Sequence, residues 1–471
     1  MTTAHPSKIR LRAYKVGFGD CLLLTVTYGS KLPDGRRERH ILIDCGTVEN
    51  ADDGPTIGQV AELVAEHCGG QLDMVVATHR HRDHIAGFGD SKGSEVLDRL
   101  NPRIVVRPWT DVPEDKRDDP ALALADHQLH FLSVLDGLQP QAEALAAFSF
   151  DNRGVAKRAA RLAEFGFKNP EAVALLEQWG SRGRAEYVSA GMTLDLADAL
   201  PGVNVRVLGP PTLADVPSLT RYAKESEEYW LGLAEGDGLT SLVAEGDAGS
   251  LDQAMRVLAE PGGMGAAEWL LRALDSRRVS QGLEIVEALD DVLNNTSVIL
   301  LVTIGSRRLL LPGDAQAENW SLALDQAEGA GQRTRDARLA SALGRVDLYK
   351  VGHHGSRNAT PKRLTNHWKG PVAEGHQVVS VLTTKKGVYE KSTEGAVPKE
   401  ELVTGLRAYG PVYSTDELDP DVWWMDLEAP TRGPAVFTHT AGPRVATPAR
   451  KPRKPSKSRQ ATEQADPPAR R

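Results

Sequence analysis

A run of four potential metal ligands places the strongest constraint on this chain. The stretch VVATHRHRDHIAGF, residues 75–88, contains His79, His81, Asp83 and His84 directly after an apolar, strand-like segment. On a helix of about 100° per residue these four side chains would share no face. At the end of a strand, His79 and His81 project to the same side, and a tight turn before Gly87 brings Asp83 and His84 back toward the same point. The pattern predicts half of a metal site, and the alternative is a polar surface loop.

The residue types in this run are typical of a catalytic metal site. Imidazole and carboxylate groups suit zinc, manganese or iron, and a ligand set without cysteine favours catalysis over a structural role. With 13 histidines in 471 residues, such a run arises by chance on the order of 10⁻³ times. The three cysteines, Cys21, Cys45 and Cys68, lack CxxC spacing, which argues against a disulfide framework and against a cysteine zinc site.

Length and composition indicate a globular chain with one large decorated domain or two domains. At 41% hydrophobic and 25% charged residues, the chain can bury a sizeable core. Its longest apolar runs, CLLLTV and SVILLVTI, are far shorter than the roughly 18 residues that a membrane span needs. The first residues show no apolar core followed by a cleavage site, so no secretory signal is expected. We expect a cytoplasmic protein without membrane contact.

Charge is distributed unevenly along the chain. The segment from Arg444 onward has nine Lys/Arg against two acids, so the net charge of −8 leaves the first 443 residues at −15. This Pro-, Ser- and Lys/Arg-rich end lacks aromatic residues, and we expect residues 443–471 to form a disordered basic tail. Such a tail is either a basic arm for nucleic acid or a solubilising terminus. The acidic body itself repels phosphate, although residues 153–168 contain five basic residues and one acid.

Strand-like and helix-like segments alternate, which predicts α/β organisation. Strands are expected within 8–29, 41–46, 71–78 and 103–109, with helices over 57–68 and 95–100. Further strands are expected within 192–211, at 296–314 with a turn at Gly305–Ser306, and near 346–352 and 378–384. Two helical blocks, about 111–185 and 213–293, interrupt this pattern. We interpret them as insertions in a single domain, residues 1–442. They form a platform on which a protein partner could dock, a lid over the metals or an inert elaboration.

Four motifs in chain order resemble those of the metallo-β-lactamase-fold hydrolases. HxHxDH after a buried strand is the first, and ILIDCG resembles the motif whose aspartate, here Asp44, orients ligands. LLLPGDA resembles the strand end with the bridging carboxylate, here Asp314, and YKVGHHGS resembles the late histidine motif, here His353 or His354. The resemblance implies a four-layer αββα sandwich carrying two large helical insertions.

Within this superfamily the chain most resembles the soluble hydrolase domain of the competence (DNA-uptake) channel protein. The segments KVGFGDCLLL, NNTSVILLV, KVGHHGS and AVPKEELVTGLRAYGPVYSTDE carry this likeness, which covers roughly 8–110, 186–212 and 294–416. The chain departs from the superfamily where many members have a further metal-binding histidine, because VRVLGPPT offers Gly209, Pro210 and Pro211. It also has KKGVYEKSTEGAVP where relatives have NxYxHP. One metal position is therefore expected to be weak.

The resemblance implies a specific set of ligands. One ion would be held by His79 and His81 and the other by Asp83, His84 and His353, with Asp314 bridging them. Two zinc ions are expected, and manganese is the alternative metal. Which histidine of the HHGS segment is the ligand stays open at this point.

Asp83 and His354 are the expected catalytic residues, Asp83 as acceptor of the water proton and His354 as a group near the substrate. Lys350 is interpreted as a surface lysine on its strand, and Asp20 either forms a turn or hydrogen-bonds behind the ligands.

The expected activity is metal-dependent hydrolysis of a phosphodiester by a metal-activated water, in a phosphodiesterase or nuclease acting on nucleic acid. Two alternatives are left open. The first is a hydrolase of a small ester, lactone or thioester on the same scaffold. The second is a regulatory or scaffold protein with a vestigial site.

Overall fold

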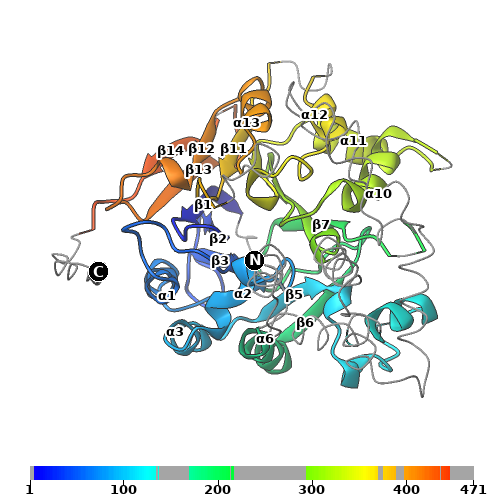
Figure 1. Cartoon of the computed structure of the whole chain (residues 1–471), viewed down its shortest axis with the longest axis horizontal. Helices are drawn as coiled ribbons and strands as arrows, with labels where there is room; N and C mark the ends of the chain where they lie inside the picture. The colour runs from blue at the N-terminus through cyan, green and yellow to red at the C-terminus, as the bar shows by residue number, and fades with distance from the viewer. Residues whose placement is uncertain are drawn as a thin grey trace, which may run out of the picture.

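Two β-sheets form the centre of the computed structural model (Figure 1). The structure describes residues 5–122, 124–133, 136, 169–212, 214–216, 293–331, 333–369, 375–388, 397–434 and 436–445. Every statement below on the fold refers to these residues.

The first sheet has eight strands and combines antiparallel and parallel pairing. Its order is β14 (Thr438–Ala441), β13 (Trp424–Pro430), β1 (Pro6–Tyr14), β2 (Cys21–Tyr28), β3 (Glu38–Cys45), β4 (Met74–Val76), β5 (Ile104–Pro108) and β6 (Arg184–Val188). Neighbouring strands are antiparallel from β14 to β3 and parallel from β3 to β6. The parallel half therefore ends its strands at one common edge.

The second sheet has six strands and the same mixed character. Its order is β12 (Val412–Ser414), β11 (Val379–Leu382), β10 (Leu348–Lys350), β9 (Arg307–Leu311), β8 (Ile299–Ile304) and β7 (Val203–Gly209). The strands from β7 to β9 are antiparallel, and those from β9 to β12 are parallel. Gly305 turns β8 into β9 with φ of 61°, a left-handed conformation that glycine adopts without a steric penalty.

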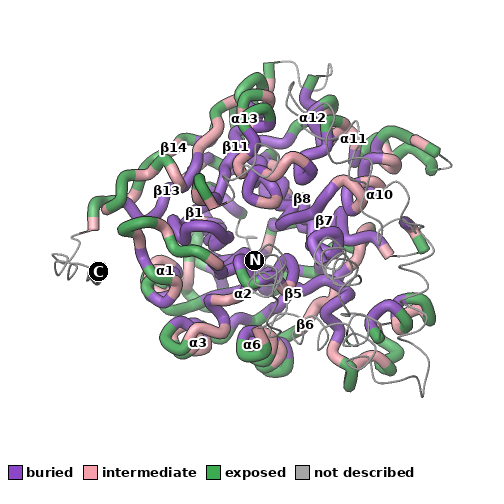
Figure 2. Tube along the Cα trace, viewed as in Figure 1, coloured by how far each residue is buried: buried purple, intermediate pink, exposed green. Residues whose placement is uncertain are grey.

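Three apolar clusters separate four layers. Because side chains alternate along a strand, Leu22 and Leu24 of β2 join the cluster between the two sheets, whereas Leu23 joins the cluster on the outer face. That outer face of the first sheet packs against α1 (Ile57–His67), α2 (Arg82–Gly89), α3 (Gly93–Asp98) and α6 (Pro170–Arg182). The second sheet packs against α10 (Ala317–Glu328), α11 (Ala337–Leu343), α12 (Lys362–His367) and α13 (Glu400–Arg407). Figure 2 shows the buried strands between outer helices with exposed faces. This αββα arrangement confirms the predicted fold class.

The predicted insertions lie largely outside the described residues, since 137–168 and 217–292 are not described. The basic stretch at 153–168 is among them. At the end of the first block, α6 buries Leu176 and Trp179 against the first sheet, and β6 pairs with β5. Most of the predicted tail, 446–471, also lies outside the described residues, whereas Arg444 forms ion pairs with Asp419 and Asp421.

No helix in the described part of the chain is both long and apolar enough to cross a membrane.

Candidate metal centre

The predicted ligands meet where strands of both sheets end. Asp44 lies on β3 and Thr78 follows the neighbouring parallel strand β4, whereas Asp314 follows β9 and His354 follows β10. The two edges touch, since a Cβ added to Gly313 would lie 2.7 Å from the Cβ of Thr78. With φ of 56°, Gly313 takes the left-handed turn that leads into Asp314.

Four buried side chains form the centre of the site. Asp83, His84, Asp314 and His354 each offer a ligand atom within 4.8 Å of the others. The Nε2 atom of His84 lies 3.1 Å from Asp314 Oδ2. The Nε2 atom of His354 lies 3.0 Å from Asp83 Oδ2 and 3.4 Å from Asp314 Oδ2. Residues that are 230 or more positions apart in the chain therefore share one point, as the motifs predict.

The early histidines lie beside this group. The Nε2 atom of His79 and the Nδ1 atom of His81 are 3.0 Å apart, and the His79 ring centroid is 4.2 Å from that of His84. The turn expected before Gly87 is the first turn of α2, which begins at Arg82 and carries Asp83 and His84. A loop followed by a helix, rather than a single tight turn, thus brings the four residues of the run together.

The position at which the motif resemblance predicts a further histidine lies at the end of β7. A Cβ added to Gly209 there would lie 2.1 Å from Asn319 Oδ1, so the side chain of Asn319 occupies the space beside this glycine. Two other histidines, His127 and His130, are exposed on a separate segment. Among the described residues, the end of β7 thus supplies no imidazole to the His79–His81 pair.

Asp44 holds the early cluster from behind. Its carboxylate accepts hydrogen bonds of 2.7 Å from the backbone N–H and from the hydroxyl of Thr78. It accepts a third, also 2.7 Å long, from Nδ1–H of His84. This fixes the His84 tautomer with Nε2 free to face Asp314, as the motif resemblance implies. Thr78 was not singled out from the sequence, although its place at the end of a strand before the first histidine was the available signal.

The HHGS segment turns sharply. His353 and His354 have φ of 42° and 50°, a left-handed conformation that is uncommon for residues other than glycine. In this turn the Nδ1–H of His354 donates to the carbonyl of Thr383 at 2.9 Å, which directs Nε2 toward Asp83 and Asp314. His353 is only partly buried, and its backbone N–H donates to Asp314 Oδ1 at 3.0 Å. The geometry favours His354, rather than the predicted His353, as the ligand from this segment. Ser356, the serine that ends the HHGS segment, is also only partly buried.

Charges in the centre are strongly coupled. Burial disfavours protonation of His84, but Asp314 and Asp44 outweigh it and raise its pKa well above the usual value. Burial likewise opposes ionisation of Asp314, but His84 and His354 hold its pKa well below the usual range. The pKa of His354 is raised to about 10, since Asp314 and Asp83 outweigh burial. For His79, burial and then the neighbouring His84 and His81 lower the pKa well below its usual value.

The donor set fits divalent metal ions. It consists of imidazole nitrogens and carboxylate oxygens without cysteine, which suits zinc or manganese at a catalytic site. The Oδ1 atom of Asp83 is buried and accepts no hydrogen bond from the described residues. A bound cation would satisfy such an oxygen, whose isolation is otherwise costly.

A second group, Asp20, Asp44 and His84, also has three potential ligand atoms close together. Here an ammonium is already present, since Lys350 forms an ion pair with Asp20 and its Nζ lies 3.9 Å from Asp314 Oδ1. Burial disfavours the charge on Lys350, but Asp20 and Asp314 outweigh it and raise its pKa. The interpretation of Lys350 as a surface lysine is wrong, because the residue is 1% exposed. The signal for a buried position was the spacing of two residues from Leu348, since residues i and i+2 of a strand share a face and Leu348 faces the inter-sheet core.

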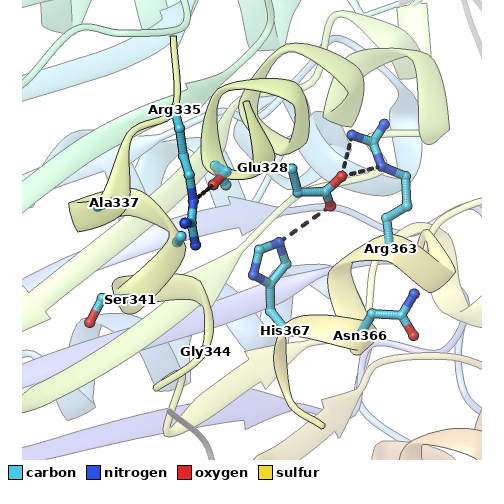
Figure 3. A pocket seen from close by; sticks show the side chains of 10 residues that line it. Glu328, Arg335, Ala337, Ser341, Gly344, Arg363, Asn366 and His367 are labelled. Carbon is cyan, nitrogen blue, oxygen red and sulfur yellow. Dashed lines mark hydrogen bonds and ion pairs between the residues drawn. The ribbon is translucent and has the colours of Figure 1, made fainter. Parts of the chain in front are cut away.

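A surface cavity of about 540 Å³ lies elsewhere, between α10, α11 and α12 (Figure 3). Glu328 within it forms ion pairs with Arg363 and His367. None of its lining residues belongs to the metal-ligand candidates, so this cavity is separate from the centre.

Comparisons with known proteins give limited likenesses. No protein-family model matches the chain. Eighty residues are 32% identical to Recombination protein 2 of Haemophilus influenzae, a stretch that is 17% of this chain and 8% of that protein. The chain thus spans less than two thirds of the length of this curated relative.

Three solved structures align with most of the chain. The metallo-β-lactamase-fold protein YhfI of Bacillus subtilis is 9% identical with a TM-score of 0.31, covering 86% of this chain and 96% of that one. The metallo hydrolase Igni18 of Ignicoccus hospitalis is 10% identical with a TM-score of 0.32, covering 87% and 96%. A variant of the β-hydroxylase CmlA is 11% identical with a TM-score of 0.32, covering 90% and 54%. Such low scores carry no argument, so the fold class rests on the sheets and the three apolar clusters.

Proposed function

We propose that this chain is a metal-dependent hydrolase that cleaves phosphodiesters with a metal-activated water. The observation that carries the proposal is the buried group of Asp83, His84, Asp314 and His354 beside the His79–His81 pair. A structural metal site would have its ligands closed around one ion, commonly with cysteine. Two adjacent sets of imidazoles and carboxylates instead suit a hydrolytic site for two ions.

Each residue has a distinct part in this proposal. When bound, two divalent ions would lower the pKa of a water and stabilise the attacking and leaving oxygens of a phosphodiester. His79 and His81 would hold one ion, and Asp83, His84 and His354 the other. Asp314 lies within 3.4 Å of both His84 and His354 and is suited to bridge. Asp83, whose buried carboxylate lies beside His354 and Asp314, would also accept the proton of the water.

Zinc is the proposed metal, with manganese as the alternative, and the ion at His79 and His81 is expected to bind more weakly. The end of β7 supplies no further imidazole to that position, because Gly209 stands there.

Nucleic acid is the proposed substrate class. The matched stretch of a protein whose name refers to recombination supports it. The net charge of −15 over the first 443 residues opposes a polyanion, so the basic residues from Arg444 onward would supply the attraction. The cytoplasmic location and a protein partner on the helical insertions stay predictions.

The test combines metal analysis with a substrate panel. Purified protein loaded with zinc or manganese is assayed on bis-p-nitrophenyl phosphate, single-stranded DNA, an acyl ester, a lactone and a thioester. His79→Ala and Asp314→Ala should each lower phosphodiester turnover by more than about 100-fold while the protein stays folded. His127→Ala removes an exposed histidine and serves as the matched control.

The pattern of activity separates the alternatives. Turnover of esters, lactones or thioesters without turnover of phosphodiesters would replace the proposal with a small-substrate hydrolase. Less than one ion per chain under metal-replete conditions would favour a scaffold protein with a vestigial site.

A further inference from the structure

A buried ion pair lies directly behind the metal centre. Asp20 and Lys350 are each 1% exposed and form an ion pair between the start of β2 and the end of β10. Burying two charges is costly unless both are well paired. Neither the motif run nor the proposed chemistry uses this pair, so its position demands a separate explanation.

Asp20 lies next to three of the four residues of the central group, His354, His84 and Asp83. Its carboxylate lies 3.7 Å from Nδ1 of His354 and 3.8 Å from Nδ1 of His84, behind the faces that point to Asp314. Its backbone N–H donates to the carbonyl of Asp83 at 2.9 Å. The hydroxyl of Thr383 also donates to the Asp20 carboxylate.

Lys350 reaches the fourth ligand. Its Nζ lies 3.9 Å from Asp314 Oδ1, whereas the Oδ2 atom lies next to His84 and His354. The ammonium therefore lies between two carboxylates, one paired with it and one proposed to hold metal. If Asp20 lost its charge, the ammonium would keep Asp314 as its nearest carboxylate.

The same ammonium lies beside a second potential cation site. Asp20, Asp44 and His84 offer three ligand atoms within 4.8 Å of one another. With Lys350 paired to Asp20, an internal cation already meets the negative charge of this group.

We propose that Asp20 and Lys350 are a positioning pair, in which Asp20 holds the ammonium away from Asp314 and the ammonium keeps Asp20 from binding metal. The proposal rests on the metal centre of the proposed function but not on its substrate. Removing the Asp20 charge should release Lys350 toward Asp314, where it competes with the ion. Removing both charges should relieve that competition.

The experiment is a double-mutant cycle on zinc binding with the full-length chain. Asp20→Asn, Lys350→Met and the double variant preserve side-chain size, and Zn²⁺ affinity and stoichiometry are measured by competition with a chelating dye. Asp347→Asn is the matched control, because Asp347 and Arg307 form a buried ion pair of 3.0 Å in the same sheet. Circular dichroism and thermal midpoints report folding.

Asp20→Asn should weaken Zn²⁺ binding by about 10–100-fold, the range for groups that orient metal ligands. The double variant should bind Zn²⁺ at least about tenfold more tightly than Asp20→Asn, whereas Asp347→Asn should change only the thermal midpoint. A purely structural pair would leave affinity unchanged or make the double variant the weakest binder, and either result overturns the proposal. If Asp20→Asn does not fold, Thr383→Val serves instead, because it removes one hydrogen bond to Asp20. It should lower the Zn²⁺ affinity relative to wild type, by less than the range given for Asp20→Asn. An unchanged affinity would count against the proposal.

This outcome is separable from that of the proposed function. Wild-type protein that binds zinc but hydrolyses no phosphodiester would refute the proposed substrate, and the cycle could still support the pair. If the protein hydrolyses phosphodiesters but the effects of Asp20→Asn and Lys350→Met on Zn²⁺ affinity simply add, only the positioning role of the pair is refuted.

Discussion

Replacing Asp44 with asparagine tests the hydrogen bonds behind the early cluster. Asp44 is fully buried, and its carboxylate accepts three hydrogen bonds of 2.7 Å from Thr78 and His84. Its φ of 55° is left-handed, a conformation that asparagine tolerates better than most residues. Asp44→Asn therefore changes charge and hydrogen bonding with little backbone penalty.

The size of the effect follows from the three donors. An amide has one oxygen, so in either orientation its NH₂ group faces a donor, either the backbone N–H of Thr78 or Nδ1–H of His84. A lost hydrogen bond to a charged group costs about 1.5–3 kcal/mol. Burial of the Asp44 carboxylate raises its pKa, which shows that the buried charge is costly. A neutral amide avoids this cost, and so part of the loss is offset. We expect the free energy of unfolding of metal-free protein to fall by about 2 kcal/mol.

Zinc affinity should fall as well, by about 10–100-fold, because the charged carboxylate that orients His84 is replaced by a neutral amide. Urea denaturation with a chelator present measures the first quantity, and competition with a chelating dye measures the second. Asp44→Ala should be less stable than Asp44→Asn by about a further 1 kcal/mol, because alanine resists the left-handed conformation. Wild-type zinc affinity in Asp44→Asn would refute the argument that Asp44 orients His84.

Three further predictions concern the ligand, the pH dependence and the packing. His354→Ala should weaken Zn²⁺ binding by more than about 100-fold and His353→Ala by less than about tenfold in the same dye competition, whereas the reverse order would return the ligand role to His353. Burial, then nearby arginines, lowers the pKa of His40 to about 4, so this histidine is neutral in the fold. The unfolded state binds this proton at a higher pH than the folded state does, so the free energy of unfolding should fall as the pH drops below about 6.5, by up to about 3 kcal/mol near pH 4. His40→Gln should flatten this slope, which urea denaturation with a chelator measures. Gly46→Ala places a Cβ 2.5 Å from the backbone of His84 and should displace the start of α2 and abolish tight zinc binding, whereas Gly29→Ala, with nothing within 4 Å, should behave as wild type.

Strand periodicity and the spacing of motifs predicted most of the core. The strands β1 to β5 and β7 to β11, with α1 and α3, lie in the expected segments because alternation and helical spacing are local properties of the sequence. The strands β13 and β14 were missed, because residues 424–430 are a strand by virtue of pairing with β1, more than 400 positions away. Lys350 was wrongly placed on the surface, Asp20 was left open between a turn and a hydrogen bond behind the ligands, and Thr383 was not singled out. A buried polar residue is explained only by a partner that the fold supplies.

Ligands from both sheets also explain why one chain must fold as a whole to make this centre. Asp44 and His84 belong to the first sheet and its helix layer, whereas Asp314, Lys350 and His354 belong to the second. The cluster of Leu24, Val76, Leu311 and Leu348 packs the two sheets face to face and so sets the distance between these groups. An ion shared by His84 and Asp314 would bind this stacked state and not the unfolded chain, so it would stabilise the interface between the sheets. Metal binding at this site and the inter-sheet core would thus depend on each other, which makes zinc affinity a measure of correct stacking of the two sheets.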